Sequence, residues 1–306
     1  MIHIAFNIDH NYVRFCAVTM VSVLENNKGH DFTFHILNED LAADDKRVLA
    51  DLAARYGAAC CFYAIAPEKL KGLSISKFQN RISMATYYRC FLSDLLPSSL
   101  DRVLYLDCDL LVEQPLDALW ATNLEDKAAA VVEDIGYDDL RRYETLCYPP
   151  EKSYFNAGVM LVNLDYWRKH NVPKLCMDLY REHPERIVYN DQDLLNYVMQ
   201  DSKRMVDLKW NVQDGFYRTS IKKRPGWEEK YGPSLRQPGI LHYTNRKPWE
   251  YENQHPLRAD WFAYVDFTPF GELKHISAAM KVKRFFRLLP FTLGLRKRKY
   301  LNQNEF

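Results

Sequence analysis

Short apolar runs alternate along the chain with longer amphipathic segments, a pattern typical of an α/β protein. Apolar runs predict strands over residues 2–7, 32–37, 59–65, 103–112, 128–132, 154–164 and 239–241. Helical spacing of apolar residues predicts helices over 13–25, 42–56, 86–96, 115–120 and 194–199. We therefore expect a mixed, mostly parallel central sheet, with ligands bound beyond the carboxyl ends of its strands.

Two polar stretches interrupt this pattern, residues 67–83 and residues 213–238, and both are predicted to be loops. The sheet is expected to continue to about residue 250. We therefore predict a domain over residues 1–250 and a C-terminal extension over residues 251–306.

The composition is that of a globular protein, with 47% hydrophobic residues in 306 and only 11 glycines. No run of apolar residues is long enough to span a membrane, and no secretory signal peptide is expected. The seven cysteines have no CxxC spacing, which favours a reducing compartment. We expect a cytoplasmic protein, attached peripherally to the inner face of the plasma membrane.

Charge is unevenly distributed, although the formal net charge is only +1. Nine Lys and Arg and no acidic residue lie between Leu273 and Asn304; since only Glu305 follows as a charge, residues 1–272 sum to −7. Bulky apolar residues interleave with the cations over 274–300, which predicts binding to an anionic membrane surface. A solvated basic tail and a helix packed on an acidic surface remain alternatives. No nucleic-acid-binding signature is present, so nucleic acid is not an expected partner.

One segment combines burial with charge: Val103–Val112 carries Asp107 and Asp109 inside an apolar run. Burying an unpaired carboxylate costs several kcal/mol, and side chains two apart on a strand point the same way. A divalent cation between the two carboxylates would offset their repulsion and leave positions for substrate phosphates. The alternative is a strand end at which both acids turn into solvent.

Six sequence elements occur in one order along the chain. They are Asn-Ile-Asp-His-Asn-Tyr (7–12), Thr-Tyr-Tyr-Arg (86–89), Leu-Tyr-Leu-Asp-Cys-Asp (104–109), Tyr-Phe-Asn-Ala-Gly-Val (154–159), Asn-Asp-Gln-Asp (190–193) and His-Tyr-x3-Lys-Pro-Trp (242–249). Together they resemble the family 8 retaining glycosyltransferases, especially the bacterial lipopolysaccharide α-galactosyl- and α-glucosyltransferases. The resemblance covers residues 2–250 and implies a GT-A fold that binds a nucleotide-sugar.

The resemblance implies that Asp107, Asp109 and His242 bind Mn²⁺, or Mg²⁺, next to the donor diphosphate. An imidazole ligand favours Mn²⁺ over Mg²⁺. From the residues alone, His242 is equally consistent with a core histidine. Lys247 matches a diphosphate contact and would otherwise be a surface lysine. Cys108 lies inside the motif, and Asn245 stands where the family commonly has Gly.

The resemblance also assigns the donor contacts. Asp9, Asn11 and Tyr12 match the uracil and ribose positions, although Asp9 could be a helix cap and Tyr12 a core aromatic residue. Asn7 stands where a small residue is usual. The remaining matches, which include sugar and phosphate contacts, are Thr86, Arg89, Asp134, Asn156, Asp191 and Gln192. Without the resemblance, Arg89 would be predicted to be exposed and Asp191 to be an N-cap.

The predicted reaction is transfer of galactose or glucose from UDP-galactose or UDP-glucose to a saccharide acceptor, lipid-linked or free, of lipopolysaccharide or a related surface glycan. Gln192 matches the residue below the anomeric carbon, and an amide is a poor nucleophile beside a carboxylate. We therefore favour attack from the face of the departing phosphate, with Asp191 as the alternative nucleophile. A catalytically degenerate nucleotide-sugar-binding protein is the rival hypothesis, and the sequence does not distinguish the two sugars.

Overall fold

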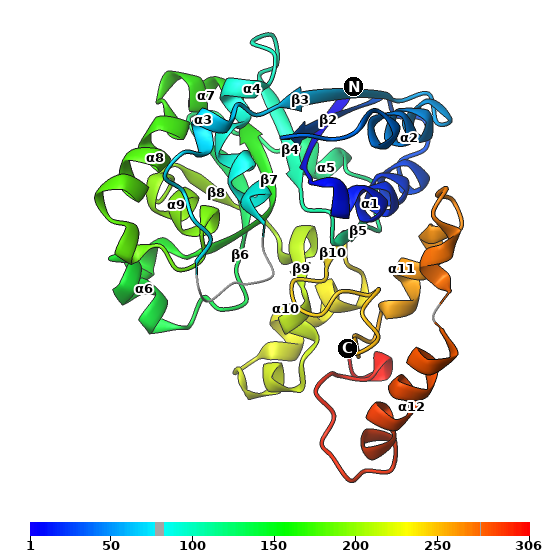
Figure 1. Cartoon of the computed structure of the whole chain (residues 1–306). Coiled ribbons are helices and arrows are strands. Elements are labelled where there is room, and N and C mark those ends of the chain that lie inside the picture. The colour runs from blue at the N-terminus through cyan, green and yellow to red at the C-terminus, as the bar shows by residue number, and fades with distance from the viewer. Residues whose placement is uncertain (77–82, 276) are drawn as a thin grey trace. The chain divides into compact units, whose positions relative to one another are not determined.

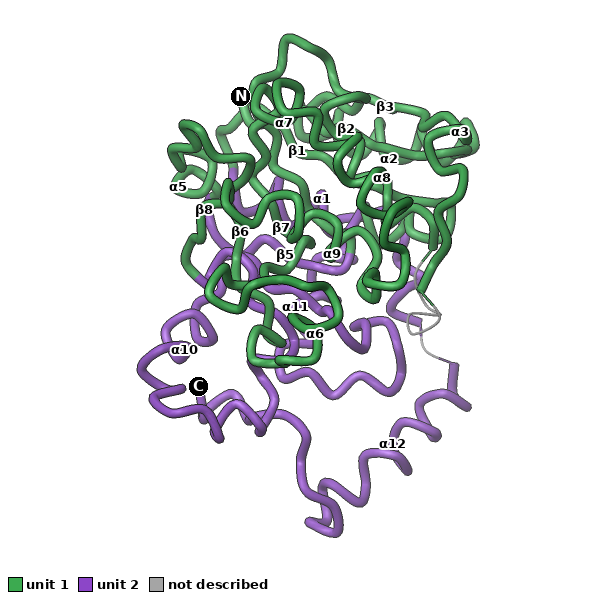
Figure 2. The backbone as a smooth tube through the Cα atoms, turned by 90° about the vertical axis from the view of Figure 1, so that its left-hand side faces the viewer, with its two compact units in different colours: residues 1–16, 28–108, 116–207 green, residues 17–27, 109–115, 208–306 purple. Residues whose placement is uncertain are grey.

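The computed structural model describes residues 1–76, 83–275 and 277–306, so part of the predicted loop at 67–83 lies outside the described residues. Two compact units are distinguished by their tertiary contacts (Figure 2). Unit 1 comprises residues 1–16, 28–108 and 116–207, and unit 2 comprises residues 17–27, 109–115 and 208–306. Helix α1 (Val13–Asn26) contributes its first turn to unit 1 and the remainder to unit 2. The predicted domain boundary at residue 250 stays a prediction.

Unit 1 is built on a mixed, mostly parallel seven-stranded sheet of order β3-β2-β1-β4-β7-β6-β8 (Figure 1). Among the described strands of this sheet, only β7 runs antiparallel to its neighbours, β4 and β6. The central strands β4 and β7 are almost entirely buried, which explains why they read as continuous apolar runs. The strands are β1 (Ile2–Asn7), β2 (Phe32–Asn38), β3 (Ala59–Ala64), β4 (Arg102–Leu106), β6 (Ala129–Glu133), β7 (Phe155–Asn163) and β8 (Lys203–Met205).

The helices of unit 1 connect these strands, and two of them carry site residues. A 3₁₀ segment, η2 (Met84–Phe91), occupies most of the helix predicted over 86–96, and helix α9 starts at Asp191. The α-helices are α2 (Ala43–Ala54), α3 (Pro67–Leu70), α4 (Leu92–Leu95), α5 (Asp117–Trp120), α6 (Leu140–Leu146), α7 (Leu164–Lys169), α8 (Val172–Glu182) and α9 (Asp191–Val198).

The prediction of one strand over residues 103–112 is wrong. Strand β4 ends at Leu106, and β5 (Leu110–Val112) belongs to a different sheet. The apolar residues on both sides are buried as expected, but Asp107, Cys108 and Asp109 form a break between the strands. The argument that both carboxylates point the same way along one strand therefore does not apply.

Unit 2 contains a three-stranded sheet of order β5-β10-β9, with β10 (Ile240–His242) in the centre and β9 (Val212–Gln213) at one edge. Its helices are α10 (Trp227–Arg236), α11 (Arg258–Val265) and α12 (Ala278–Thr292). The prediction of loops throughout 213–238 is therefore wrong. Helix α10 buries Tyr231 and Leu235, and their contribution to the core outweighs the Gly- and Pro-rich composition that suggested a loop.

The C-terminal segment of unit 2 folds back onto the same unit. Tyr300 and Leu301 are buried, and the backbone of Leu301 donates to the carbonyl of Tyr217 over 2.8 Å. Helix α12, which precedes this segment, has no buried residue, and its side chains Val282, Phe285 and Phe286 are all more than half exposed. Among the described residues, no helix is both long and apolar enough to cross a membrane.

Candidate active site

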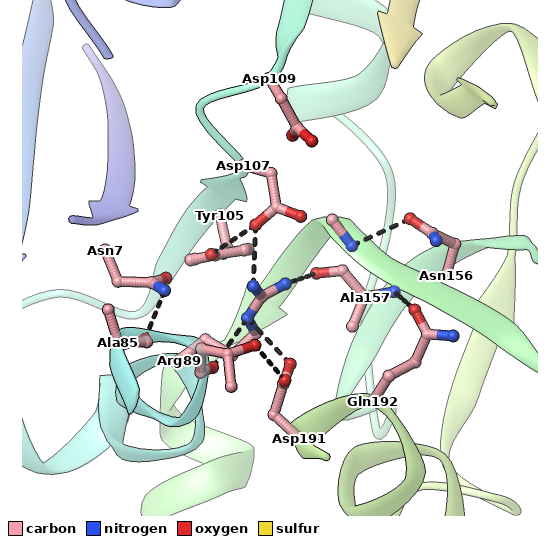
Figure 3. Close-up of polar contacts among 12 residues, drawn as sticks. Asn7, Ala85, Arg89, Tyr105, Asp107, Asp109, Asn156, Ala157, Asp191 and Gln192 are labelled. Carbon is pink, nitrogen blue, oxygen red and sulfur yellow. Dashed lines mark hydrogen bonds and ion pairs between the residues drawn. The ribbon is translucent and has the colours of Figure 1, made fainter. Parts of the chain in front are cut away.

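Arg89 is the centre of a buried charged cluster in unit 1 (Figure 3). Its Nη2 lies 2.9 Å from Oδ1 of Asp107, and its Nε lies 3.0 Å from Oδ2 of Asp191. Nη1 donates to the carbonyl of Ala157 over 2.8 Å, and the guanidinium lies 4.6 Å from the centre of the Tyr105 ring. A single cation thus holds two carboxylates from distant parts of the chain, and the interpretation of Arg89 as an exposed residue is wrong.

Local backbone geometry explains how these side chains converge. In the 3₁₀ segment η2, residues three apart lie on the same side, so Thr86 and Arg89 both reach Asp191. The hydroxyl of Thr86 donates to Asp191 Oδ1. At the end of β4, the hydroxyl of Tyr105 donates to Asp107 Oδ1 over 2.8 Å.

Burial and charge act in opposite directions on these groups. Burial raises the pKa of Asp191 to about 6, although Arg89 and the Thr86 hydroxyl lower it. Burial lowers the pKa of the Arg89 guanidinium, but Asp107 and Asp191 more than compensate, so the net pKa is raised. Arg89 therefore stays charged at all physiological pH values.

A second hydrogen-bonded group in unit 1 surrounds Asp134, which follows the end of β6. Its Oδ2 accepts from Asn156 over 3.1 Å and from Nε2 of Gln192 over 3.3 Å, while its Oδ1 contacts Arg142 at 2.7 Å. The Oε1 of Gln192 accepts from the backbone amide of Ala157 over 3.0 Å. The structure thus brings together residues that the sequence placed in separate motifs, and Arg142 joins them.

The first of the six sequence elements, residues 7–12, lies at the end of β1. Asn7 donates to the carbonyl of Ala85 over 2.7 Å, and Oδ1 of Asn7 and Oδ1 of Asp9 are buried with no partner in the described structure. Asp9 does occupy the N-cap position of the 3₁₀ segment η1 (His10–Tyr12), but its side chain makes no capping bond. Asn11 is exposed, and Tyr12 packs edge-on against Phe15.

Asp109 and His242 come together in unit 2. His242 Nε2 lies 3.1 Å from Oδ1 of Asp109, and Lys247 forms an ion pair with the same carboxylate. His242 ends β10 and is almost fully buried. Burial raises the pKa of Asp109, but Lys247 and His242 outweigh it and hold the pKa well below its usual range. Asp109 is therefore a carboxylate, the form that binds a metal ion.

Two predicted positions have less structural support as site residues. Asn245 is exposed, and Cys108 is buried between the two aspartates of its motif. The chemistry of the donor set does fit a divalent cation, since Asp107, Asp109 and His242 each offer one ligand atom of a type that Mn²⁺ accepts.

Three residues of these clusters were not predicted. Tyr105 lies two residues before Asp107, and the strand period of two could have indicated that they share a face. Arg142 and Asn211 carry no local signal. Asn211, buried in unit 2, lies 2.9 Å from Nδ1 of His242.

The comparisons with known proteins identify a hexosyltransferase of the GT-A fold. The solved galactosyltransferase LgtC, in complex with donor and acceptor sugar analogues, matches this chain with a TM-score of 0.78 and 25% identity, over 92% of this chain and 100% of that one.

The chain belongs to glycosyl transferase family 8, whose family model matches residues 3–253. A lipopolysaccharide 1,2-glucosyltransferase of Escherichia coli is 30% identical over 97% of this chain and 83% of its own length. A lipopolysaccharide 1,3-galactosyltransferase of Salmonella typhimurium is 33% identical over 83% of this chain and 75% of its own length. General stress protein A of Bacillus subtilis is 27% identical over 89% of this chain and 96% of its own length.

Proposed function

We propose that this enzyme transfers galactose or glucose from a UDP-sugar, with retention of configuration and with Mn²⁺, to a saccharide of lipopolysaccharide or a related surface glycan. Both sugars and this acceptor class are named in the lipopolysaccharide relatives. The observation that carries the proposal is the hydrogen-bonded group of Asp134, Asn156 and Gln192 beside the Arg89 cluster. Such a group offers the dense array of donors and acceptors that a hexose requires.

The proposed nucleotide contacts come from the end of β1. Asp9 accepts from uracil N3–H, a role supported by its buried Oδ1, which lacks a partner in the described structure. Tyr12 stacks on the uracil ring, and Asn11 contacts the ribose. Asn7 donates to the carbonyl of Ala85, the residue before Thr86. Its proposed role is therefore to orient the segment that carries Thr86.

The proposed sugar contacts divide into two groups. Asp134 and Asn156 bond sugar hydroxyls, and Arg142 orients Asp134 for this role. Arg89 bonds sugar hydroxyls or phosphate and keeps Asp107 and Asp191 in place.

Asp107, Asp109 and His242 are the proposed metal ligands, with Cys108 as the buried spacer between the first two. Bound Mn²⁺ would supply Lewis-acid stabilisation of the negative charge that develops on the leaving diphosphate. Lys247 contributes a second positive charge to that diphosphate and neutralises Asp109 in the free enzyme. Asn245 provides the exposed turn before Lys247.

Gln192 is the proposed residue below the anomeric carbon, where its amide oxygen stabilises oxocarbenium character. Both ends of its amide are held, by Ala157 and Asp134, which fixes its orientation. Asp191 is less suited to be a nucleophile because Thr86 and Arg89 engage its two oxygens separately. This engagement supports attack from the face of the departing phosphate, whose oxygen takes the acceptor proton.

The segment 274–300 is the proposed attachment to an anionic membrane surface, at the inner face of the plasma membrane. Exposed Phe285 and Phe286 support this role, since large apolar side chains on a basic helix bury themselves in the lipid interface.

The test is hydrolysis and transfer with a panel of UDP-sugars, with and without Mn²⁺. We expect Mn²⁺-dependent loss of UDP-galactose or UDP-glucose, and at least a hundredfold slower loss in Asp109→Asn. Asp51→Asn, at an exposed carboxylate of α2, is the matched control and should retain activity. Equal rates in Asp109→Asn and the wild type would overturn the metal assignment, and UDP binding without turnover of any sugar would overturn the proposed donor.

A further inference from the structure

A pocket of about 820 Å³ lies in unit 1 among α3, α4, α7 and α8. None of its lining residues belongs to the Arg89 cluster or to the group around Asp134. Its volume falls within the range of small-molecule sites, about 300–1,000 Å³. The proposed reaction has no use for this pocket.

Apolar side chains and hydrogen-bonding groups both line the pocket. Leu73, Met177 and Tyr180 supply accessible aliphatic, thioether and ring surface, whereas Phe91 and Trp167 are buried. Polar groups from three separate segments also line it: the Ser93 hydroxyl is buried with no partner in the described structure, and Lys71 and Asn171 are exposed. Asn171 has φ 52, a left-handed conformation, and its amide does not cap the helix α8 that follows it. A few polar groups on a largely apolar wall are the usual design of a ligand site.

The charge of the lining is positive. Five cationic side chains face two acidic ones, Glu68 and Asp94; the cations are Lys69, Lys71, Arg168, Lys174 and Arg181. Asp94 is occupied by Lys69, and Lys174 and Arg181 share Asp178 at distances of 2.5 and 3.0 Å. Lys71 is left as a cation with no carboxylate partner in the described structure, so the pocket favours an anionic group.

We infer that this pocket is a second saccharide site, separate from the donor site, that binds a sugar carrying a phosphate or a carboxylate. Lys71 pairs with the anionic group, Asn171 bonds hydroxyls, and Met177 and Tyr180 cover the C–H face of the ring. A sugar satisfies both halves of the lining, because it presents hydroxyls at its rim and carbon at its faces. The choice of a sugar rests on the proposed function, whereas the anionic group follows from the lining alone.

The wall of the pocket is connected to the donor-sugar residues within unit 1. The Tyr180 hydroxyl lies 2.9 Å from both the amide and the hydroxyl of Ser74. The Ser74 carbonyl accepts from Tyr87, and Tyr87 and the Ser76 amide both donate to Asn190. Asn190 immediately precedes Asp191, so an occupant that contacts Tyr180 lies one hydrogen-bonded network away from the reacting sugar.

Equilibrium binding to the full-length chain, without donor or metal, tests this site independently of turnover. The probes are glucose 6-phosphate, glucuronate, glucose and inorganic phosphate, measured by titration calorimetry and ligand-observed NMR. We expect saturable binding of at least one anionic sugar, weakened about tenfold in Lys71→Gln and in Asn171→Ala. Lys169→Gln is the matched control, because this exposed lysine lies on α7 beside Arg168 but outside the lining.

The two anionic sugars identify the source of the charge: tighter binding of glucose 6-phosphate indicates a phosphorylated glycan, and tighter binding of glucuronate a uronic acid. Lack of saturable binding by both, or equal affinity of Lys71→Gln and the wild type, overturns the site. Inorganic phosphate binding as tightly as glucose 6-phosphate overturns the saccharide part. Displacement of the sugar by UDP overturns the separation from the donor site. A transferase inactive on every UDP-sugar would overturn the proposed function but leave this binding result unchanged.

Discussion

Nδ1 of His242 lies 2.9 Å from Oδ1 of Asn211, and both side chains are buried in unit 2. An amide oxygen accepts, so Nδ1 donates in this contact and Nε2 is the ring nitrogen that faces Asp109. A metal-binding histidine is commonly oriented in this way by a partner on its other nitrogen.

Replacement of this partner should weaken the metal site. We expect Asn211→Ala to bind Mn²⁺ at least tenfold more weakly than the wild type, measured by calorimetry without donor, because His242 loses its orientation. Asn211→Asp retains an acceptor for Nδ1–H and should stay within about threefold of the wild type. Equal weakening in both variants would contradict this role of the hydrogen bond, because Asn211→Asp keeps both the acceptor and the volume of the side chain.

The contact between Tyr300 and Asp214 should contribute measurably to stability. The Tyr300 hydroxyl donates to Oδ1 of Asp214 over 2.8 Å, and Arg218 lies 3.1 Å from the other oxygen. Because Asp214 is completely buried, Tyr300→Phe leaves one oxygen without its donor and should lower the free energy of unfolding by about 1–3 kcal/mol. Urea denaturation measures this loss, and Tyr251→Phe, which removes a more exposed contact to Glu252, should change it by less than about 0.5 kcal/mol.

Glu113 should make the stability depend on pH. Burial and the nearby Asp260 raise its pKa from the ordinary 4.5 to about 7, although Tyr264 opposes the shift. Between these pH values the unfolded chain has lost the proton that the folded chain keeps, so stability falls as the pH rises and levels off above 7. The loss amounts to about 3 kcal/mol, and Glu113→Gln should abolish it.

Urea midpoints at pH 5 and pH 8 test this pH dependence. The difference between wild type and variant isolates Glu113 from the other titrating groups. Parallel pH profiles for the two proteins would contradict the assignment.

The exposed apolar residues of α12 should control binding to membranes. Phe285 and Phe286 are 60% and 64% exposed, and their joint replacement by Ser should reduce binding to phosphatidylglycerol vesicles more than tenfold. Hydrolysis of the donor should remain unchanged, because neither residue contacts the proposed site. Phe267→Ser is the control, since Phe267 is 46% exposed but lies outside 274–300. Cosedimentation with the vesicles measures the binding of each variant. A loss in Phe267→Ser equal to that of the double variant would argue for non-specific adhesion.

Much of the fold could be predicted because its core strands are buried on both faces. Strands β4 and β7 appear in the sequence as unbroken apolar runs. An apolar run indicates burial but does not identify the neighbouring strand. The sequence therefore could not predict that the chain passes from one sheet to another between Leu106 and Leu110. Helix α10 was missed because it starts after Gly226 and contains Pro233, both typical of loops.

The candidate site, like the fold, could be predicted from the sequence only in part. Asp109 and His242, far apart in sequence, do meet, as do Asp134, Asn156 and Gln192. Their supporting residues could not be predicted, since Arg142 and Asn211 acquire their partners only through the packing of distant segments. A motif identifies positions better than roles: Cys108 and Asn245 both occupy motif positions, but Cys108 is buried and Asn245 is exposed.

Helix α12 is held near its middle, and the chain is held again beyond its C-terminal end. Arg284 donates to the carbonyls of Tyr251 and Asn253, and beyond the helix the chain is held by Tyr300 on Asp214. A free tail would act as a tether that lets an enzyme explore a wide volume above a lipid surface. A segment held at two points behaves differently. Binding of α12 to a lipid surface would set both the distance and the orientation of unit 2 relative to that surface in a single event.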